Sequence, residues 1–131
     1  AFFTVLVEGD DMNDPIADQS RSILDGHFVL DRTLTDFGIY PPINILNSAS
    51  RVMNDIVTKE HLKAVFKFRR MYATLKENEV LIRIGAYQRG SDPEIDEAMI
   101  KKVAIEEFMK QDRDEIVPFE ETVQRLQALA G

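Results

Sequence analysis

Apolar residues gather at the start of the chain in a way that predicts a strand followed by a helix. Residues 2–7 form a nearly continuous apolar run rich in β-forming side chains, which is typical of a strand buried on both faces of a parallel sheet. Residues 9–14 are rich in turn-forming side chains, and Pro15 suits the first turn of a helix. We therefore expect a helix that runs from Pro15 to about Ser22 and stops near Gly26.

The next segment continues this alternation of strands and helices. Residues 26–30 predict a second short strand, and residues 31–37 predict a short helix that ends at Gly38. Residues 40–43 should be extended, because each proline disfavours helical geometry in the residue before it. A polar turn over residues 47–50 follows. The order strand, helix, strand is that of an α/β fold.

Helical spacing dominates the second half of the chain. Thr58 is placed to cap a helix that reaches about Leu75, a short helix follows over residues 77–86, and residues 90–94 combine cap residues, proline and acids as a further helix start. Pro118 opens a last helix. The inner positions expected in the helix after residue 94 are Ile95, Met99, Ile100, Val103, Ala104 and Phe108. We predict an α/β unit over residues 1–55 and a helical bundle over residues 56–131.

Composition narrows the classes of protein that fit this pattern. The chain has 131 residues and a formal net charge of -7, which argues against a nucleic-acid-binding domain with its basic face. It has no cysteine, and no apolar run approaches the ~18 residues of a membrane span. The apolar start lacks the basic region of a signal peptide. We therefore expect a cytoplasmic protein, and the abrupt opening on a strand suggests a piece of a longer chain.

Residue types that often carry chemistry give few signals by themselves. The sequence contains no phosphate-binding motif of the type G-x-x-x-x-G-K-S/T, and His27 and His61 stand in no ligand-spaced motif, so no metal site is predicted. A row of basic residues recurs at helical spacing and reads as a solvated face or, alternatively, as a contact for lipid or export substrates rather than DNA. The row consists of Lys59, Lys63, Lys67 and Arg70.

Four stretches together resemble the flagellar and type III secretion export ATPases. They are residues 5–18, 23–30, 40–53 and 85–96, in the same order and at consistent spacing. These enzymes are similar in turn to the catalytic subunits of rotary ATP synthases. The resemblance implies an α/β edge of a RecA-like P-loop NTPase core followed by an all-α C-terminal helical bundle. It covers the flagellar and the virulence enzymes alike.

The resemblance also implies what the whole protein does. The parent is expected to be a homohexameric ATPase that uses ATP and Mg²⁺ to feed substrates into a secretion channel. Its phosphate-binding loop, magnesium-binding aspartate and catalytic glutamate lie upstream of the matched segment in this family. We therefore expect these 131 residues alone to hold no nucleotide tightly and to be inactive.

Two residues match nucleotide-site positions of the family, and a third is a further candidate. Arg51, in the order Ser50-Arg51-Val52, matches the arginine finger that reaches the γ-phosphate held by the neighbouring subunit. A permanently charged, planar guanidinium suits charge that spreads over phosphoryl oxygens, although an arginine after a serine-rich turn is otherwise an ordinary surface residue. Tyr40 matches an aromatic residue that lies against adenine, as an alternative to packing on its prolines. Phe108 is a candidate to complete that pocket, with core packing as the alternative.

An acidic loop resembles the loop that faces the central hole and touches the stalk in the rotary relatives, and in an export ATPase it is expected to meet a coiled-coil stalk protein. Asp11, Asn13 and Asp14 fall in this loop, where acidic side chains can steer a coiled-coil partner that carries basic residues. A helix-capping role for Asp11 or Asp14 is equally compatible. The resemblance further implies docking of export chaperones and substrates, peripheral association with the membrane export apparatus, and no nucleic-acid partner.

Two other readings of the sequence remain alternatives. The first is a catalytic-type subunit of a rotary ATP synthase, although residues 7–11 and 85–93 favour the export enzyme. The second is a non-catalytic helical module that docks chaperone and substrate complexes. The residues upstream of this chain would separate them, because a phosphate-binding loop there indicates an ATPase.

Overall fold

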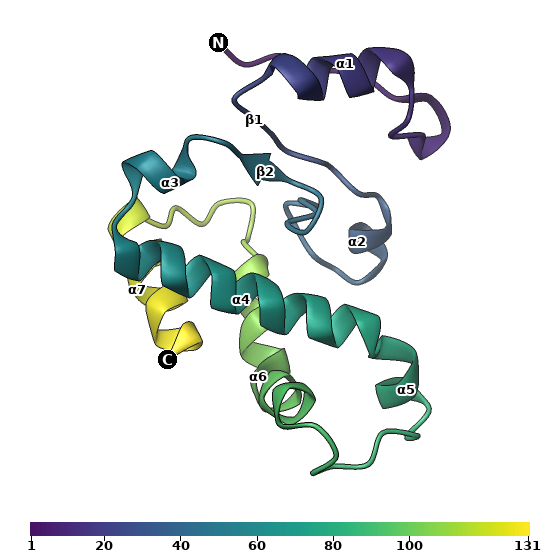
Figure 1. Ribbon diagram of the computed structural model, residues 1–131, viewed down its shortest axis with the longest axis vertical. Coiled ribbons are helices and arrows are strands. Elements are labelled where there is room, and N and C mark those ends of the chain that lie inside the picture. Colours follow the sequence, from purple (N-terminus) through teal and green to yellow (C-terminus); the bar gives the residue numbers. More distant parts are fainter.

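The computed structural model describes the backbone of all 131 residues and every side chain except that of Asp10. Figure 1 shows the N-terminal part as a loosely folded arm that carries α1, β1, β2 and α2, above a group of crossing helices formed by α4, α6 and α7. Among the described residues, no helix combines the length and apolar content needed to cross a membrane.

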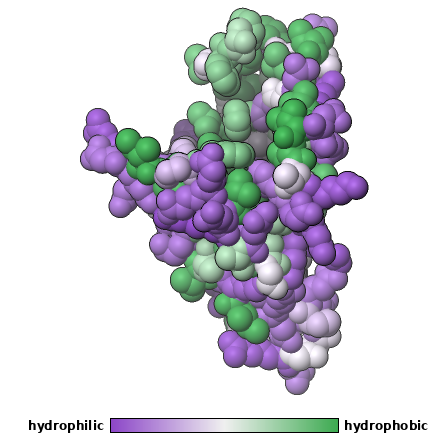
Figure 2. Space-filling view, turned by 90° about the vertical axis from the view of Figure 1, so that its left-hand side faces the viewer, coloured by the Kyte–Doolittle hydropathy of each residue, from purple (hydrophilic) through white to green (hydrophobic). Residues whose placement is uncertain are grey.

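The strand predicted for residues 2–7 is not formed. These residues form no regular element, and the described strands pair only with each other, so the run has no ladder to join. Its side chains are open to solvent, with Phe2 98% and Leu6 91% exposed. Figure 2 shows apolar side chains gathered at the end of the molecule where this segment lies in Figure 1. A strand of the type predicted needs neighbours that these residues do not supply.

Local sequence signals explain the helix that follows. A short turn of 3-10 helix over Glu8–Asp10 precedes α1, which spans Pro15–Ile23. Asp14 caps α1, because its Oδ1 accepts hydrogen bonds from the backbone N–H groups of Ile16 at 2.9 Å and Ala17 at 3.2 Å. Pro15 occupies the first helical position, as predicted.

Two short strands hold the arm together. β1 (Gly26–His27) pairs antiparallel with β2 (Ala49–Ser50), and Gly26 lies opposite Ser50. The approach is so close that a Cβ at Gly26 would lie 2.8 Å from the carbonyl oxygen of Ala49. The strand observed at Gly26–His27 is shorter than the one predicted over residues 26–30. A separate bridge joins Leu30 to Ile43.

The rest of the arm consists of turns around one small helix. α2 spans Thr33–Asp36 and is followed by Gly38, whose φ of 68° is the left-handed conformation that glycine adopts without strain. The Tyr40–Pro41 peptide bond is cis. The prediction that residues 40–43 are extended was wrong in part, since Tyr40 and Pro41 form a bend and the Ile43 N–H donates to the Pro41 carbonyl oxygen at 2.8 Å, which tightens the chain. The segment leads into the turn before β2.

The helical part begins with a helix that the sequence did not predict and continues with four that it did. Thr58 caps the longest of them through a hydrogen bond of 3.2 Å from the His61 N–H to its Oγ1, and Asp92 caps another in the same way. The helices are α3 (Met53–Ile56), α4 (Lys59–Glu77), α5 (Glu79–Arg83), α6 (Pro93–Met109) and α7 (Phe119–Ala130).

The core lies where α4, α6 and α7 cross. It comprises Ala64, Phe68, Met71, Tyr72, Leu75, Ala98, Ile105, Leu126 and Ala130. The predicted inner face of α6 was wrong in part, since Ile100 is 83% and Val103 69% exposed, whereas Ala98 and Ile105 are completely buried. Apolar residues lie on more than one side of α6, so spacing alone does not select the buried side, and packing against α4 and α7 decides it.

Candidate functional site

Arg51 follows β2 directly and is held by backbone contacts with the end of α1. Its N–H donates to the carbonyl oxygen of Asp25 at 2.7 Å, and its Nη2 donates to the carbonyl oxygen of Arg21 at 3.1 Å. The side chain itself is exposed. A guanidinium that carries few hydrogen bonds of its own keeps donors free for another group. The structure therefore places Arg51 as an anchored cation at the surface.

A shallow pocket of about 350 Å³ lies beside this guanidinium. Its walls come from the end of α1 and from both strands, namely Asp18, Arg21, Ser22, Gly26, His27, Ala49 and Arg51. Two guanidinium groups face one carboxylate here, so the rim carries net positive charge. This local sign is opposite to that of the whole chain, and it suits a phosphate group rather than a cation.

Arg21 ties α1 to the loop in front of it. Its Nη2 donates to the carbonyl oxygen of Met12 at 2.7 Å and to Oδ1 of Asp18 at 3.1 Å. Its Nε is buried and has no hydrogen-bond partner among the described groups. Because the carbonyl of the same residue accepts from Arg51, the loop, the helix and the exposed guanidinium are mechanically connected.

The turn before β2 is held by its own polar side chains. Oδ1 of Asn44 accepts from the N–H groups of Leu46 at 3.2 Å and Asn47 at 3.1 Å. The hydroxyl of Ser48 donates to the carbonyl oxygen of Asn44 at 2.6 Å and accepts from the Val29 N–H at 3.0 Å. The backbone that leads to Arg51 is thus fixed over the residues immediately before it.

Asp31 supports this turn from the side of α2. Its Oδ2 accepts a hydrogen bond of 3.0 Å from Nδ2 of Asn44. Hydrogen bonding from the Thr33 hydroxyl lowers the pKa of this carboxyl group below its ordinary value, partial burial opposes the shift, and Asn44 adds to it. The lowered pKa keeps Asp31 ionised as an acceptor for Asn44.

Tyr40 and Phe108, the two candidates for adenine contact, lie in different surroundings. The Tyr40 side chain is 55% exposed, and its carbonyl oxygen accepts from the Gln111 N–H at 2.7 Å, just beyond the end of α6. Phe108, in the last turn of α6, is half-buried and packs edge-to-face on Phe68 with ring centroids 5.1 Å apart. Tyr40 therefore has a free ring face, whereas Phe108 is engaged with the core.

The acidic loop is ordered by its own side chains. Oδ1 of Asp11 accepts from the Asn13 N–H at 2.9 Å, and Asp14 caps α1. The alternative in which Asp14 acts as a cap is therefore confirmed. Asp11 and Asn13 are exposed, so their side chains remain accessible to a partner. The cap and a partner contact do not exclude each other.

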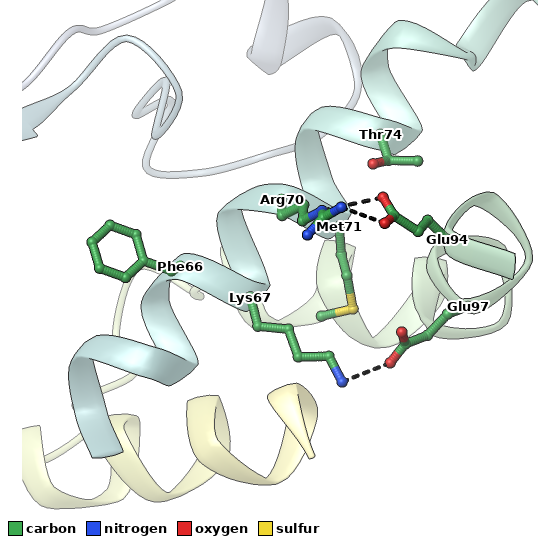
Figure 3. A pocket seen from close by; sticks show the side chains of 7 residues that line it. All are labelled: Phe66, Lys67, Arg70, Met71, Thr74, Glu94 and Glu97. Atoms are coloured by element: carbon green, nitrogen blue, oxygen red, sulfur yellow. Dashed lines mark hydrogen bonds and ion pairs between the residues drawn. The ribbon is translucent and has the colours of Figure 1, made fainter. Parts of the chain in front are cut away.

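Half of the basic row on α4 is paired with acids on α6. Lys67 Nζ lies 2.8 Å from Oε1 of Glu97, and Arg70 donates from Nε and Nη2, on one edge of its guanidinium, to the two carboxylate oxygens of Glu94, as Figure 3 shows. The hydrogen bonds from Lys67 and Lys101 lower the pKa of Glu97 below its ordinary value. Such exposed pairs stabilise little. They do occupy two of the four cations in the row that a lipid or nucleic acid could contact.

These ion pairs border an open pocket of about 330 Å³ between α4 and α6. It is lined by Phe66, Lys67, Arg70, Met71, Thr74, Glu94 and Glu97. Its side chains are shown in Figure 3, where the two acids on α6 point toward the two cations on α4. Among the described residues, no group of three or more metal-ligating side chains is brought together, in this pocket or elsewhere.

Sequence reasoning did not single out Arg21, Asn44 or Asp31. Asn44 carried a general signal, since asparagine is favoured where side chains bond the backbone of a turn. Arg21 carried none, because its bonds to Met12 and Arg51 join parts of the chain that only the fold brings together.

A short α/β end joined to a helical domain is the order in which two models of ATP synthase-like ATPase families match this chain. The model of the T3SS EscN ATPase C-terminal domain matches residues 57–128, which is more than half of the chain. The model of the ATP synthase alpha/beta family nucleotide-binding domain matches residues 1–50. The chain therefore belongs to the family of flagellar and type III secretion ATPases.

Individual relatives agree with this assignment. The chain is 63% identical over 129 residues to the flagellum-specific ATP synthase of Helicobacter pylori, and the match covers 98% of this chain and 30% of the relative. It also superimposes on the assembled ATPase EscN from the enteropathogenic E. coli type III secretion system with a TM-score of 0.92 and 46% identity, covering 97% of this chain and 31% of that one.

A further solved structure contains EscN in complex with its central stalk EscO, with a TM-score of 0.83, 44% identity, and coverage of 89% of this chain and 29% of that one. The predicted family and fold class are confirmed by these matches. The chain spans about 30% of the length of the relatives it matches. The division at residues 55 and 56 stays a prediction.

Proposed function

We propose that this chain is the C-terminal part of a hexameric ATPase that energises protein export through a flagellar or type III secretion apparatus. The observation that carries the proposal is the exposed guanidinium of Arg51, anchored at the end of β2 in a member of this ATPase family. The cytoplasmic face of the membrane export apparatus is the proposed place of action, with peripheral attachment.

Arg51 is the proposed catalytic residue, and it acts on the nucleotide of the neighbouring subunit. A guanidinium is planar and permanently charged, so it can donate two hydrogen bonds to phosphoryl oxygens as negative charge spreads over them. Its backbone N–H and one edge are fixed to Asp25 and Arg21, which reduces the freedom that would be lost when it engages a phosphate. The positive rim of the adjoining pocket favours the approach of an anion.

Tyr40 is the proposed adenine contact within the same subunit. Its side chain is more than half exposed, and an aromatic face offers stacking to a purine without charge. Phe108, which is only partly buried in the last turn of α6, is proposed to complete the pocket. ATP bound by the parent would supply the phosphoryl group.

The proposal predicts a sharp contrast between the whole enzyme and this segment. The full-length parent should hydrolyse ATP, whereas residues 1–131 alone should show no turnover, because they contain no phosphate-binding motif. Release of inorganic phosphate, measured at equal protein concentration, tests both statements. Robust hydrolysis by the isolated segment would contradict the placement of the phosphate-binding machinery.

The acidic loop is the proposed contact for a coiled-coil stalk protein. The related ATPase EscN has been solved in complex with its central stalk, and Asp11 and Asn13 are exposed here. Asp11→Lys in the full-length ring is expected to weaken binding of the stalk protein by about tenfold, because it reverses a steering charge. Binding is measured by titration at low and high salt. Asp36→Lys, an exposed acid on α2, is the matched control, and equal effects of the two changes would refute the loop contact.

The helical domain is the proposed site for docking export chaperones and substrates. Its open pocket between α4 and α6 combines apolar and charged side chains, which suits a protein partner better than a nucleic acid. If the parent were instead a rotary ATP synthase subunit, its hydrolysis should be coupled to proton flow. If it were a non-catalytic module, it should not hydrolyse ATP. The hydrolysis experiment separates the second alternative directly.

A further inference from the structure

Arg69 on α4 bonds to the turn that leads to Arg51. Its Nη1 donates to the carbonyl oxygen of Ser48 at 3.2 Å, and its Nη2 donates to the carbonyl oxygen of Leu46 at 3.0 Å. The side chain is half-buried. The guanidinium of Arg69 thus binds two backbone carbonyls that lie more than twenty residues away in sequence. Both carbonyls belong to the N-terminal arm, whereas Arg69 belongs to the helical part.

The location of these carbonyls gives the contact its significance. Ser48 is followed directly by β2, and β2 by Arg51, so the clamped backbone is only a few peptide units from the exposed guanidinium. Peptide units are planar and β2 is paired with β1, so a shift of the turn is passed along the strand. None of the described hydrogen bonds joins Arg51 itself to the helical domain, so the bonds of Arg69 to the turn provide an indirect link.

We propose that Arg69 is a positioning residue for Arg51, through which the helical domain sets the location of the arginine finger. This inference rests on the proposed function of Arg51. When α4 moves, the clamp carries the turn with it, and the finger moves relative to the phosphate in the neighbouring subunit. A displacement of about 1 Å at such a site can reduce the rate by as much as about a hundredfold.

Holding the two parts together does not depend on Arg69 alone. Ile45 and Leu46 pack against the helical core, and the Gln111 N–H donates to the Tyr40 carbonyl at 2.7 Å. Lys76 also lies over the Phe37 ring at 5.1 Å from its centroid. A variant that lacks the Arg69 guanidinium should therefore stay folded, but the turn before β2 should be held less firmly in position.

The test uses the full-length ring with Arg69→Met, which preserves much of the apolar stem but removes both hydrogen bonds. We expect kcat to fall about tenfold while KM for ATP changes less than about twofold, because the finger acts in the transition state. Trapping of ADP with aluminium fluoride, a mimic of the transferring phosphoryl group, should fall in parallel, and ADP binding should not. Arg69→Lys retains the charge and one donor group and should recover part of the loss.

Arg125→Met is the matched control. Arg125 is an exposed arginine on α7 that pairs with Glu121 of its own helix and with Glu115, and none of its described contacts reaches residues 46–48. Its loss should leave kcat and trapping unchanged. Ring assembly is checked by light scattering for every variant. If Arg51→Ala abolishes trapping but Arg69→Met leaves both kcat and trapping normal, the positioning role of Arg69 is wrong. The proposed function of Arg51 would then still stand. Normal trapping by Arg51→Ala would instead overturn the proposed function.

Discussion

Arg51→Ala in the full-length parent is expected to reduce ATP hydrolysis by about a thousandfold or more. The methyl group of alanine cannot neutralise the charge that spreads over the phosphoryl oxygens, so the transition state loses its partner from the adjoining subunit. Ground-state affinity for nucleotide should change by less than about threefold, because the phosphate-binding loop lies elsewhere in the parent. Steady-state phosphate release and a fluorescent nucleotide titration measure the two quantities.

Mixed rings test whether the arginine acts between subunits. Subunits that carry Arg51→Ala can still hold nucleotide, and subunits with a disabled phosphate-binding loop can still offer Arg51. Rings assembled from both should regain part of the hydrolysis that neither has alone, because some boundaries unite an intact nucleotide site with an intact guanidinium. Absence of any recovery in properly assembled mixed rings, or equal loss of binding and turnover in the single variant, would contradict the assignment.

Tyr40 supplies a contrasting variant for the same assays. Stacking of an aromatic ring on a base is worth about 1–3 kcal/mol, so Tyr40→Ala should weaken nucleotide binding by about fivefold to a hundredfold with little change in kcat. Tyr40→Phe keeps the ring and should bind normally. The opposite pattern, in which kcat falls and affinity is unchanged, would remove Tyr40 from the adenine pocket.

The second large effect concerns stability. Ile105→Ala should lower the free energy of unfolding of the chain by about 2–5 kcal/mol, because it removes buried methyl groups and leaves a cavity where α4, α6 and α7 meet. Ile105 is 0% exposed in the structure. Domains have a total stability of only about 5–15 kcal/mol, so this loss is a large share. Urea unfolding followed by far-UV circular dichroism measures it.

Ile100→Ala is the matched control, since it makes the same chemical change on the same helix at a side chain that is 83% exposed. Its effect should stay within about 0.5 kcal/mol. The pair also tests which side of α6 faces the core. If the two variants were equally destabilising, the orientation of α6 in the structure would be wrong.

Signals that act over a few residues predicted the helix starts well. Asp14, Thr58 and Asp92 cap helices as their positions indicated, because a cap satisfies backbone donors only two or three residues away. Features that depend on distant partners were not predicted. Residues 2–7 lack neighbouring strands, and the buried side of α6 depends on α4 and α7.

The same distinction holds for the site. The roles of Arg51 and Tyr40 were expected from the family resemblance and stay predictions, whereas their surroundings came from the structure. Arg21 and Arg69 donate to backbone carbonyls, which every residue possesses, so nothing in the identity of the acceptor marks the pair in the sequence. Such contacts become visible only when the chain is folded.

The lack of a side chain at Gly26 lets β1 and β2 lie close together, and this close pairing fixes where Arg51, directly after β2, is placed. Gly26 faces Ser50, the residue before Arg51, and the nearest atom to a Cβ there would be a main-chain oxygen that cannot rotate away. Any larger amino acid would have to push the two strands apart and carry the neighbouring guanidinium with them. The position of this cation therefore depends on the absence of a side chain at residue 26, a constraint of volume that neither charge nor hydropathy records.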